Sequence, residues 1–127
     1  MPEIPFHLDA EKIAKQFVES IKKNTGITLQ YDVKSIKTLE SIIDQLRQLK
    51  SKEAEKIVLS AGIWFGECLR ALFGGQWHYE EQYKEWGILF TKKELTAFPI
   101  SKAFKQYKNG LEDSVQGYAI AIKSNLA

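Results

Sequence analysis

The chain has 127 residues, of which 44% are hydrophobic and 27% charged, and its net charge is +2. This composition is typical of a globular domain with one core, and it excludes the low-hydrophobicity regime of disordered chains. So small a net charge makes nucleic acid or a membrane surface a disfavoured partner for the whole molecule. We therefore expect one domain, residues 1–127.

The single cysteine and the two histidines cannot by themselves form an internal disulfide or a usual structural zinc site. The first residues show no basic region followed by an apolar one, so a secretory signal is not expected. The longest uncharged apolar stretch, residues 57–66, is well short of the roughly 20 residues that a membrane span needs. We expect a cytoplasmic protein with no membrane segment, metal or cofactor.

The first quarter of the chain reads as a helix followed by a short extended segment. Apolar residues at helical spacing predict a first helix from Asp9, its expected N-cap, to a stop at Gly26. Residues 27–32 alternate between apolar and polar and predict a short strand or an extended arm. A second amphipathic helix follows, with either Asp32 or Ser35 as its N-cap.

The third helix is predicted over residues 52–73, with Ser51 as its N-cap and Gly74 as its end. Apolar residues fill a broad arc of this helix, so we expect it to be the central, largely enclosed helix. Gly62 and Gly66 lie at one edge of the arc, where their four-residue spacing would let another backbone approach closely. Glycine inside a helix costs about 1 kcal/mol relative to alanine, so two of them indicate a packing need.

After the central helix the apolar period changes from helical to alternating. Residues 76–81 and 86–91 predict an antiparallel hairpin, and residues 94–98 a possible third strand. Pro99 or Ser101 then opens a fourth helix, and a fifth follows it. The predicted fold class is therefore α+β, with about five helices around a small antiparallel sheet.

Glu67 is the one carboxylate in the most apolar part of the central helix, and two interpretations stay open. We favour a structural role, in which Glu67 pairs with Arg70 one turn away or binds a neighbouring backbone segment. The alternative is a partly buried carboxylate that contacts a ligand or acts as a general base, in a pocket with Arg70, Trp77 and His78. Cys68 falls inside the apolar arc, so we expect a buried, unreactive thiol.

The hairpin is expected to pack one apolar face on the central helix. The side chains of that face are Trp77, Tyr79, Trp86, Ile88 and Phe90. His78 should point the other way, to solvent. Tyr83 lies at the tip among Glu80, Glu81 and Glu85, which indicates an exposed contact feature of the kind that is enriched in protein interfaces.

Lysines follow the hairpin along the fourth helix. Lys102, Lys105 and Lys108 are spaced by three and share one slowly drifting stripe. We interpret the stripe as a solvated helix face, with an anion or acidic-partner site as the alternative.

Two stretches, GIWFGECLRALFGGQW and FPISKAFKQYKNGLEDSV, together resemble a family of small bacterial domains of unknown function. The shared pattern is Gly-Glu, then Gly-Gly-x-Trp, then a helix with Pro-x-x-Lys, and the lead-in LQYDVKSIKTLESIIDQL is also similar. The resemblance covers about residues 27–118. It would make signature positions of Gly66, Glu67, Gly75, Trp77, Pro99 and Lys102. It implies the fold and no particular activity.

Common catalytic motifs are missing from the sequence: there is no Walker loop, no G-x-G-x-x-G, no H-E-x-x-H and no nucleophile elbow. We favour a non-enzymatic module of the bacterial cytoplasm that binds another protein, for example an immunity protein against a secreted toxin. A small-molecule-binding domain or enzyme with a pocket centred on Glu67 is the alternative, and nucleic-acid binding through the lysine stripe is a weaker one. The oligomeric state is left open. The predicted binding residues are Glu67, Arg70, Trp77, His78, Tyr83 and Lys102.

Overall fold

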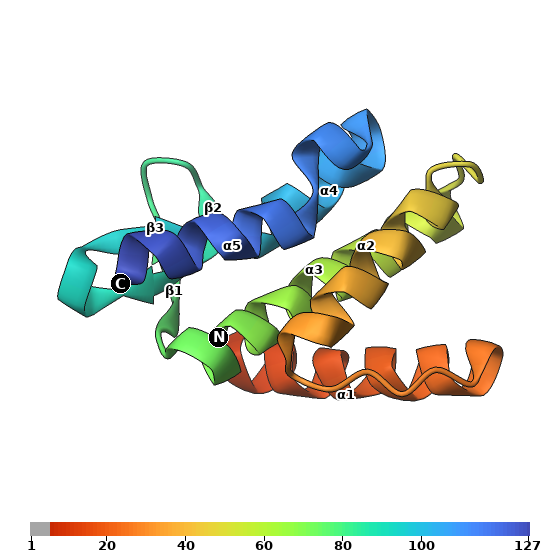
Figure 1. The fold of residues 1–127 in the computed structure, drawn as a ribbon, viewed down its shortest axis with the longest axis horizontal. Coiled ribbons are helices and arrows are strands. Elements are labelled where there is room, and N and C mark those ends of the chain that lie inside the picture. Colours follow the sequence, from red (N-terminus) through yellow and green to blue (C-terminus); the bar gives the residue numbers. More distant parts are fainter. Residues whose placement is uncertain (1–5) are drawn as a thin grey trace, which may run out of the picture.

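A computed structural model describes residues 6–127 and shows an α+β fold with five helices and a three-stranded antiparallel sheet (Figure 1). The elements, in chain order, are α1 (Phe6–Thr25), α2 (Val33–Leu46), α3 (Lys52–Phe73), β1 (Gln76–Glu80), β2 (Glu85–Phe90), the 3-10 turn η1 (Thr91–Lys93), β3 (Leu95–Ala97), α4 (Pro99–Asn109), the 3-10 turn η2 (Leu111–Asp113) and α5 (Val115–Leu126). The predicted fold class is confirmed. None of the helices in this part of the chain is long and apolar enough to cross a membrane.

The helix ends follow from local sequence. Asp32 caps α2 by accepting a hydrogen bond from the Ser35 N–H at 2.8 Å, and Ser51 caps α3 by accepting one from the Ala54 N–H at 3.1 Å. Gly74 ends α3 with a positive φ, which glycine adopts without strain. These ends agree with the prediction.

Two predictions near the start of the chain need correction or narrowing. The helix α1 begins by Phe6, so Asp9 lies within its first turn and is not its N-cap. There its carboxylate favourably faces the positive end of the helix dipole. Residues 27–32 form no strand; they are an extended arm that anchors itself by burying Leu29.

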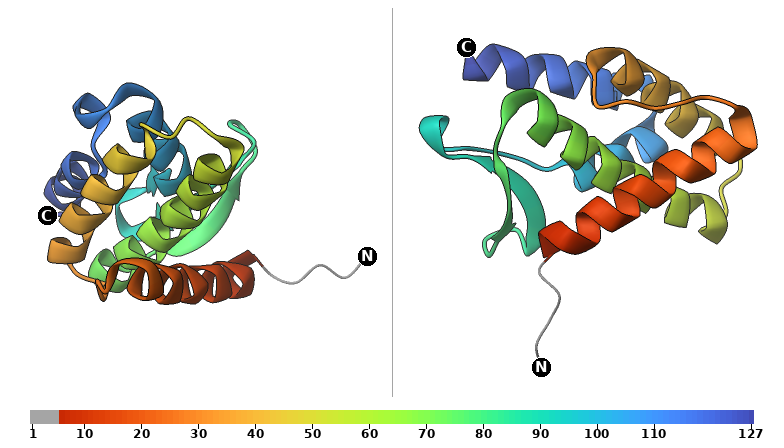
Figure 2. Two further views of the ribbon diagram at one scale, coloured as in Figure 1. Left: turned by 90° about the vertical axis from the view of Figure 1, so that its right-hand side faces the viewer. Right: turned by 90° about the horizontal axis from the view of Figure 1, so that it is seen from below.

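The helix α3 is the central element, as predicted. It packs mainly against α4 on one side and α1 on the other (Figures 1 and 2). Its residues 61–69 are all buried. Gly62 is where α4 crosses: a Cβ at this position would lie only 2.7 Å from the Ile100 Cα. The glycine therefore lets the two helix backbones approach closely.

The sheet has the strand order β1-β2-β3 with both pairs antiparallel. Trp77 pairs with Ile88 and Tyr79 with Trp86. Trp77 and Ile88 are buried as expected for this face, but Tyr79 is exposed. The core is one connected cluster that contains residues of every helix and every strand and has the fully buried Trp64 and Phe65 of α3 among its largest members.

Candidate functional site

Glu67 lies at the contact between α3 and β1 and is almost fully enclosed, with 8% of its surface exposed. Its Oε2 accepts a hydrogen bond from Arg70 Nη1 at 2.8 Å and another from Trp77 Nε1 at 2.8 Å. The Arg70 side chain also donates to the Gly75 carbonyl at 3.4 Å. The predicted pair of Glu67 with Arg70 is confirmed, and the indole of Trp77 is a further partner that sequence reasoning did not assign.

The local sequence explains this arrangement. A Cβ at Gly66 would overlap the six-membered ring of Trp77, so the glycine makes room for the indole on α3. Phe6 covers the other side of this region, with its ring centroid 4.9 Å from that of Trp77. The contact between α3 and β1 is thus built from Gly66, Glu67, Gly75 and Trp77. Each hydrogen bond to the charged carboxylate there contributes about 1.5–3 kcal/mol.

The predicted pocket around Glu67 is only partly assembled. Glu67, Arg70 and Trp77 are brought together, but His78 points away from them, and its Nε2 lies 4.0 Å from Glu80 Oε2. Neither Glu67 nor Arg70 lines any of the three principal cavities of residues 6–127. The contacts of Glu67 are those of a structural carboxylate.

Two further groups near Glu67 are also held in place. The Tyr31 ring stacks on Trp64 with centroids 5.9 Å apart, and the pKa of its hydroxyl is raised by burial and by the negative charge of Glu67. Burial, with the charge of Asp32 as a smaller cause, raises the pKa of the Cys68 thiol to about 12. The thiol is therefore protonated and inert, as predicted.

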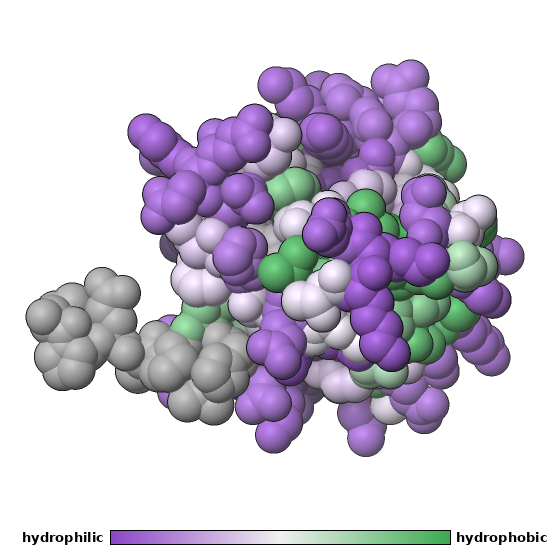
Figure 3. Space-filling view, turned by 90° about the vertical axis from the view of Figure 1, so that its left-hand side faces the viewer, coloured by the Kyte–Doolittle hydropathy of each residue, from purple (hydrophilic) through white to green (hydrophobic). Residues whose placement is uncertain are grey.

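Trp77 and His78 line a different cavity, of about 570 Å³, at the end of the molecule where α3 meets the sheet. Lys92 and Lys93 of η1 and Leu126 of α5 complete its wall. Figure 3 looks onto this end of the molecule and shows a mainly hydrophilic surface, with hydrophobic residues gathered toward one side. We assign no ligand to this cavity.

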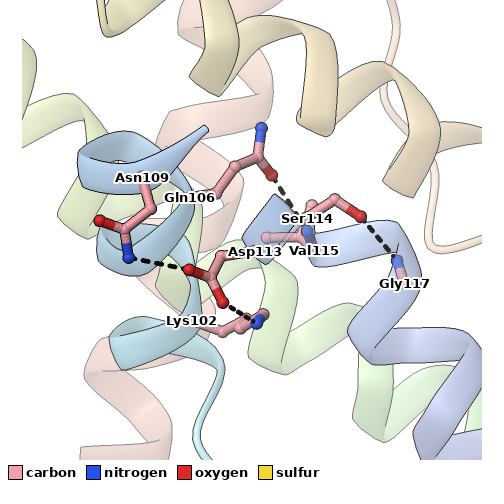
Figure 4. A network of polar contacts seen from close by, with 7 residues as sticks. All are labelled: Lys102, Gln106, Asn109, Asp113, Ser114, Val115 and Gly117. Atoms are coloured by element: carbon pink, nitrogen blue, oxygen red, sulfur yellow. Dashed lines mark hydrogen bonds and ion pairs between the residues drawn. The ribbon is translucent and has the colours of Figure 1, made fainter. Parts of the chain in front are cut away.

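Lys102 is not part of a solvated stripe, which corrects the favoured interpretation for this residue. Only 16% of its side chain is exposed, and its Nζ lies 3.0 Å from Asp113 Oδ1 (Figure 4). The same Nζ lies 5.4 Å from the centroid of the Tyr118 ring. Asn109 donates to the other carboxylate oxygen of Asp113 at 2.8 Å. Hydrogen bonds from Asn109 and Lys102 lower the pKa of Asp113. Lys102 therefore joins α4 to η2.

An apolar hollow lies beside the hairpin, and we call it the hairpin cavity. Its volume is about 470 Å³, and its lining residues are Phe6, Leu59, Ile63, Glu85, Trp86, Ile100 and Ser101. Trp86 stacks on Phe6 with centroids 4.3 Å apart and touches Tyr79 edge-on at 5.5 Å. The start of α1 lies next to the hairpin in the right-hand view of Figure 2, which agrees with these contacts.

Sequence reasoning missed the hairpin cavity because its walls come from four separate elements. One signal was present: Leu59 lies outside the apolar arc of α3, and 44% of it is exposed. Tyr83 is exposed at the hairpin tip as predicted, although its ring also packs edge-on against Phe98 at 5.5 Å.

Comparison of the chain with models of protein families, with curated proteins and with solved structures finds no match. The resemblance described from the sequence therefore stays a prediction. Within residues 6–127, no group of three or more His, Cys, Asp or Glu side chains is placed to hold a metal ion.

Proposed function

We propose that this protein is a non-enzymatic interaction module that binds another protein through its hairpin. The hairpin cavity is the observation that carries the proposal. It is a surface hollow with mainly apolar walls, and its lining residue Leu59 is exposed. Tyr79 of the hairpin is also exposed and touches Trp86 of the cavity wall. Apolar hollows next to exposed tyrosines are typical of the points where partner side chains insert.

Charge around the cavity favours a basic partner. Glu80 and Glu85 face each other directly across the hairpin, and like charges in this position destabilise a strand pair. Among the described residues Glu85 forms no ion pair within 4.0 Å. A lysine or arginine of the partner would relieve this repulsion while a neighbouring apolar side chain fills the cavity.

The test is affinity capture from the native host at low salt, with wild type and two matched variants. Ile57 and Leu59 are both on α3, but they lie about 200° apart around the helix. Leu59→Asp places a charge at the hairpin cavity, so we expect it to lose the captured protein. Ile57→Asp carries the same change on another side of α3 and should retain it.

The bound protein should also dissociate at high salt, because contacts between exposed charges are screened. Failure to capture any reproducible protein would remove the main support for the proposal. So would equal capture by wild type and a folded Leu59→Asp variant.

An immunity protein of the bacterial cytoplasm remains one concrete form of this function. A toxin gene adjacent to the gene of this protein would support it. The alternative is a ligand site centred on Glu67. Glu67 lines none of the three principal cavities of residues 6–127, which counts against it.

A further inference from the structure

The largest of the three principal hollows lies away from the hairpin, between the first three helices. It has a volume of about 710 Å³ and is called here the three-helix groove. Both α1 and α2 pack on α3, and the groove lies between them with the first half of α3 as its floor. The left view of Figure 2 faces these helices. The apolar lining residues are Ile13, Phe17, Ile21, Ile42, Leu46, Leu49 and Ile57.

The groove is open, and part of its apolar lining contacts water. Leu49 is 64% exposed and Ile57 is 38% exposed, although Ile57 lies on the most enclosed helix of the fold. Each Å² of such surface that a ligand covers contributes about 25 cal/mol to binding. The volume falls within the range of about 300–1,000 Å³ that is usual for small-molecule sites.

The lining carries no net charge, which determines the kind of ligand it favours. Its two charged residues, Glu53 and Lys56, pair with each other at 3.8 Å. Asn24 and Thr25 already donate to carbonyls of α1, at 2.9 Å and 2.6 Å. A charged ligand would lose water without gaining an unpaired opposite charge.

Three other polar side chains of the lining, Gln16, Gln45 and Ser60, make no side-chain hydrogen bond within residues 6–127. They can donate to, or accept from, one neutral polar group such as a hydroxyl, ester or amide. The groove thus complements an apolar body with a small uncharged polar end.

The size of the groove also favours a small molecule over a second copy of the chain. A stable protein interface covers about 800 Å² on each partner, much more than a single hollow between three helices offers. We propose that the three-helix groove binds a small uncharged molecule with an aliphatic body and one hydroxyl, ester or amide group.

The proposal is tested by titration with N-phenyl-1-naphthylamine, an uncharged apolar dye whose fluorescence rises in apolar sites. We expect saturable binding, and displacement of the dye by 1-decanol but not by sodium decanoate. Ile57→Asp should weaken dye binding at least about tenfold, because it puts a carboxylate in the floor of the groove. Leu59→Asp is the matched control and should bind as wild type does.

Circular dichroism and thermal unfolding verify that both variants are folded. Should Ile57→Asp not fold, Leu49→Asp at the more exposed edge of the groove takes its place, with the same expected loss. Unchanged binding in the folded groove variant, equal loss in Leu59→Asp, or equal displacement by decanoate would each overturn the proposal. A dimer that Ile57→Asp converts to monomer would also overturn it, because a second copy would then be the occupant. The hairpin proposal is unaffected by any of these outcomes.

Discussion

The Glu67 carboxylate accepts hydrogen bonds from side chains of two different elements, and we expect its replacement to destabilise the protein. Glu67→Gln keeps a carbonyl for the Trp77 indole but loses the charge that Arg70 pairs with, so the free energy of unfolding should fall by about 1 kcal/mol. Glu67→Leu leaves both donors without a partner and should cost about 3 kcal/mol. Urea unfolding of the three proteins measures the difference.

The main prediction for these two variants is that Glu67→Leu loses more unfolding free energy than Glu67→Gln does. Equal unfolding free energies in wild type and Glu67→Leu would contradict a structural role. If Glu67→Gln kept its stability but lost a ligand or partner, the carboxylate would be functional.

A side chain at position 66 would overlap the Trp77 indole, so substitutions at these two positions should have coupled effects on stability. Gly66→Ala alone should cost more than about 2 kcal/mol, because the new methyl group overlaps the indole ring. Trp77→Phe removes the overlapping ring atoms. In that background Gly66→Ala should cost far less, because only Pro99 Cγ stays close to the new methyl group, at 3.1 Å, and helix propensity favours alanine by about 1 kcal/mol. A double-mutant cycle from urea unfolding measures the coupling, and additive effects would show that the indole does not lie over Gly66.

At the scale of the elements, one contact at the junction of α4 with α5 is made by the Asp113 carboxylate of η2, which bonds to two side chains of α4. Asp113 bonds to Asn109 and Lys102, which keeps its pKa below the ordinary 3.8, so it stays charged in the folded state at a pH where it would be protonated when unfolded. Its contribution to stability is therefore present above pH 3.8 and is lost as the pH falls through the lowered pKa. Asp113→Asn should flatten this acid limb of a stability–pH curve measured by urea unfolding. A curve with an unchanged acid limb would assign it to other carboxylates.

The junction contains a second contact that local reasoning could not find. Gln106 is fully buried, donates to the Glu40 carbonyl of α2 at 2.8 Å and accepts from the Val115 N–H at 3.0 Å. Its amide nitrogen is directed away from α5 in Figure 4. Both partners are distant in sequence or follow a turn, so neither period nor capping pattern indicates them.

The helices, hairpin and caps were predictable because their signals are local. Helical spacing and the residues Ser51 and Gly74 predicted the observed ends of α3, and the alternation of apolar residues predicted the hairpin. The predicted start of α1 was wrong because aspartate is favourable in the first turn of a helix as well as at its N-cap, and Asp9 lies in the first turn.

The candidate site was harder to predict, because burial depends on which elements meet. A helical wheel put Glu67 on a polar edge and Ile57 in the apolar arc, yet Glu67 is buried under Trp77 and Ile57 lines an open groove. Lys102 was predicted to be solvated, but the turn η2 places Asp113 beside it. Contacts between distant parts of the chain decided each of these cases.

At the scale of the whole molecule, α3 separates two apolar hollows. Leu59 lines the hairpin cavity and Ile57 the three-helix groove, although the two residues are neighbours but one on the same helix. The helix α3 is covered by α1 on one side and by α4 on the other, and the two hollows lie on the sides between them. The two proposed sites can thus be altered independently by single substitutions in one helix.

The shared core should make the unfolding of the protein cooperative. One cluster of buried side chains joins all five helices to the sheet, so we expect the 127 residues to unfold as a single cooperative domain. Trp64 reports on α3, Trp77 and Trp86 report on the sheet, and far-UV circular dichroism reports mainly on the helices. Tryptophan fluorescence and circular dichroism should therefore follow one urea transition with the same midpoint. A fluorescence change that precedes the loss of helix would instead show that the sheet and its α3 contact form a separate, weaker unit, and Trp64→Phe would then leave that early change in place.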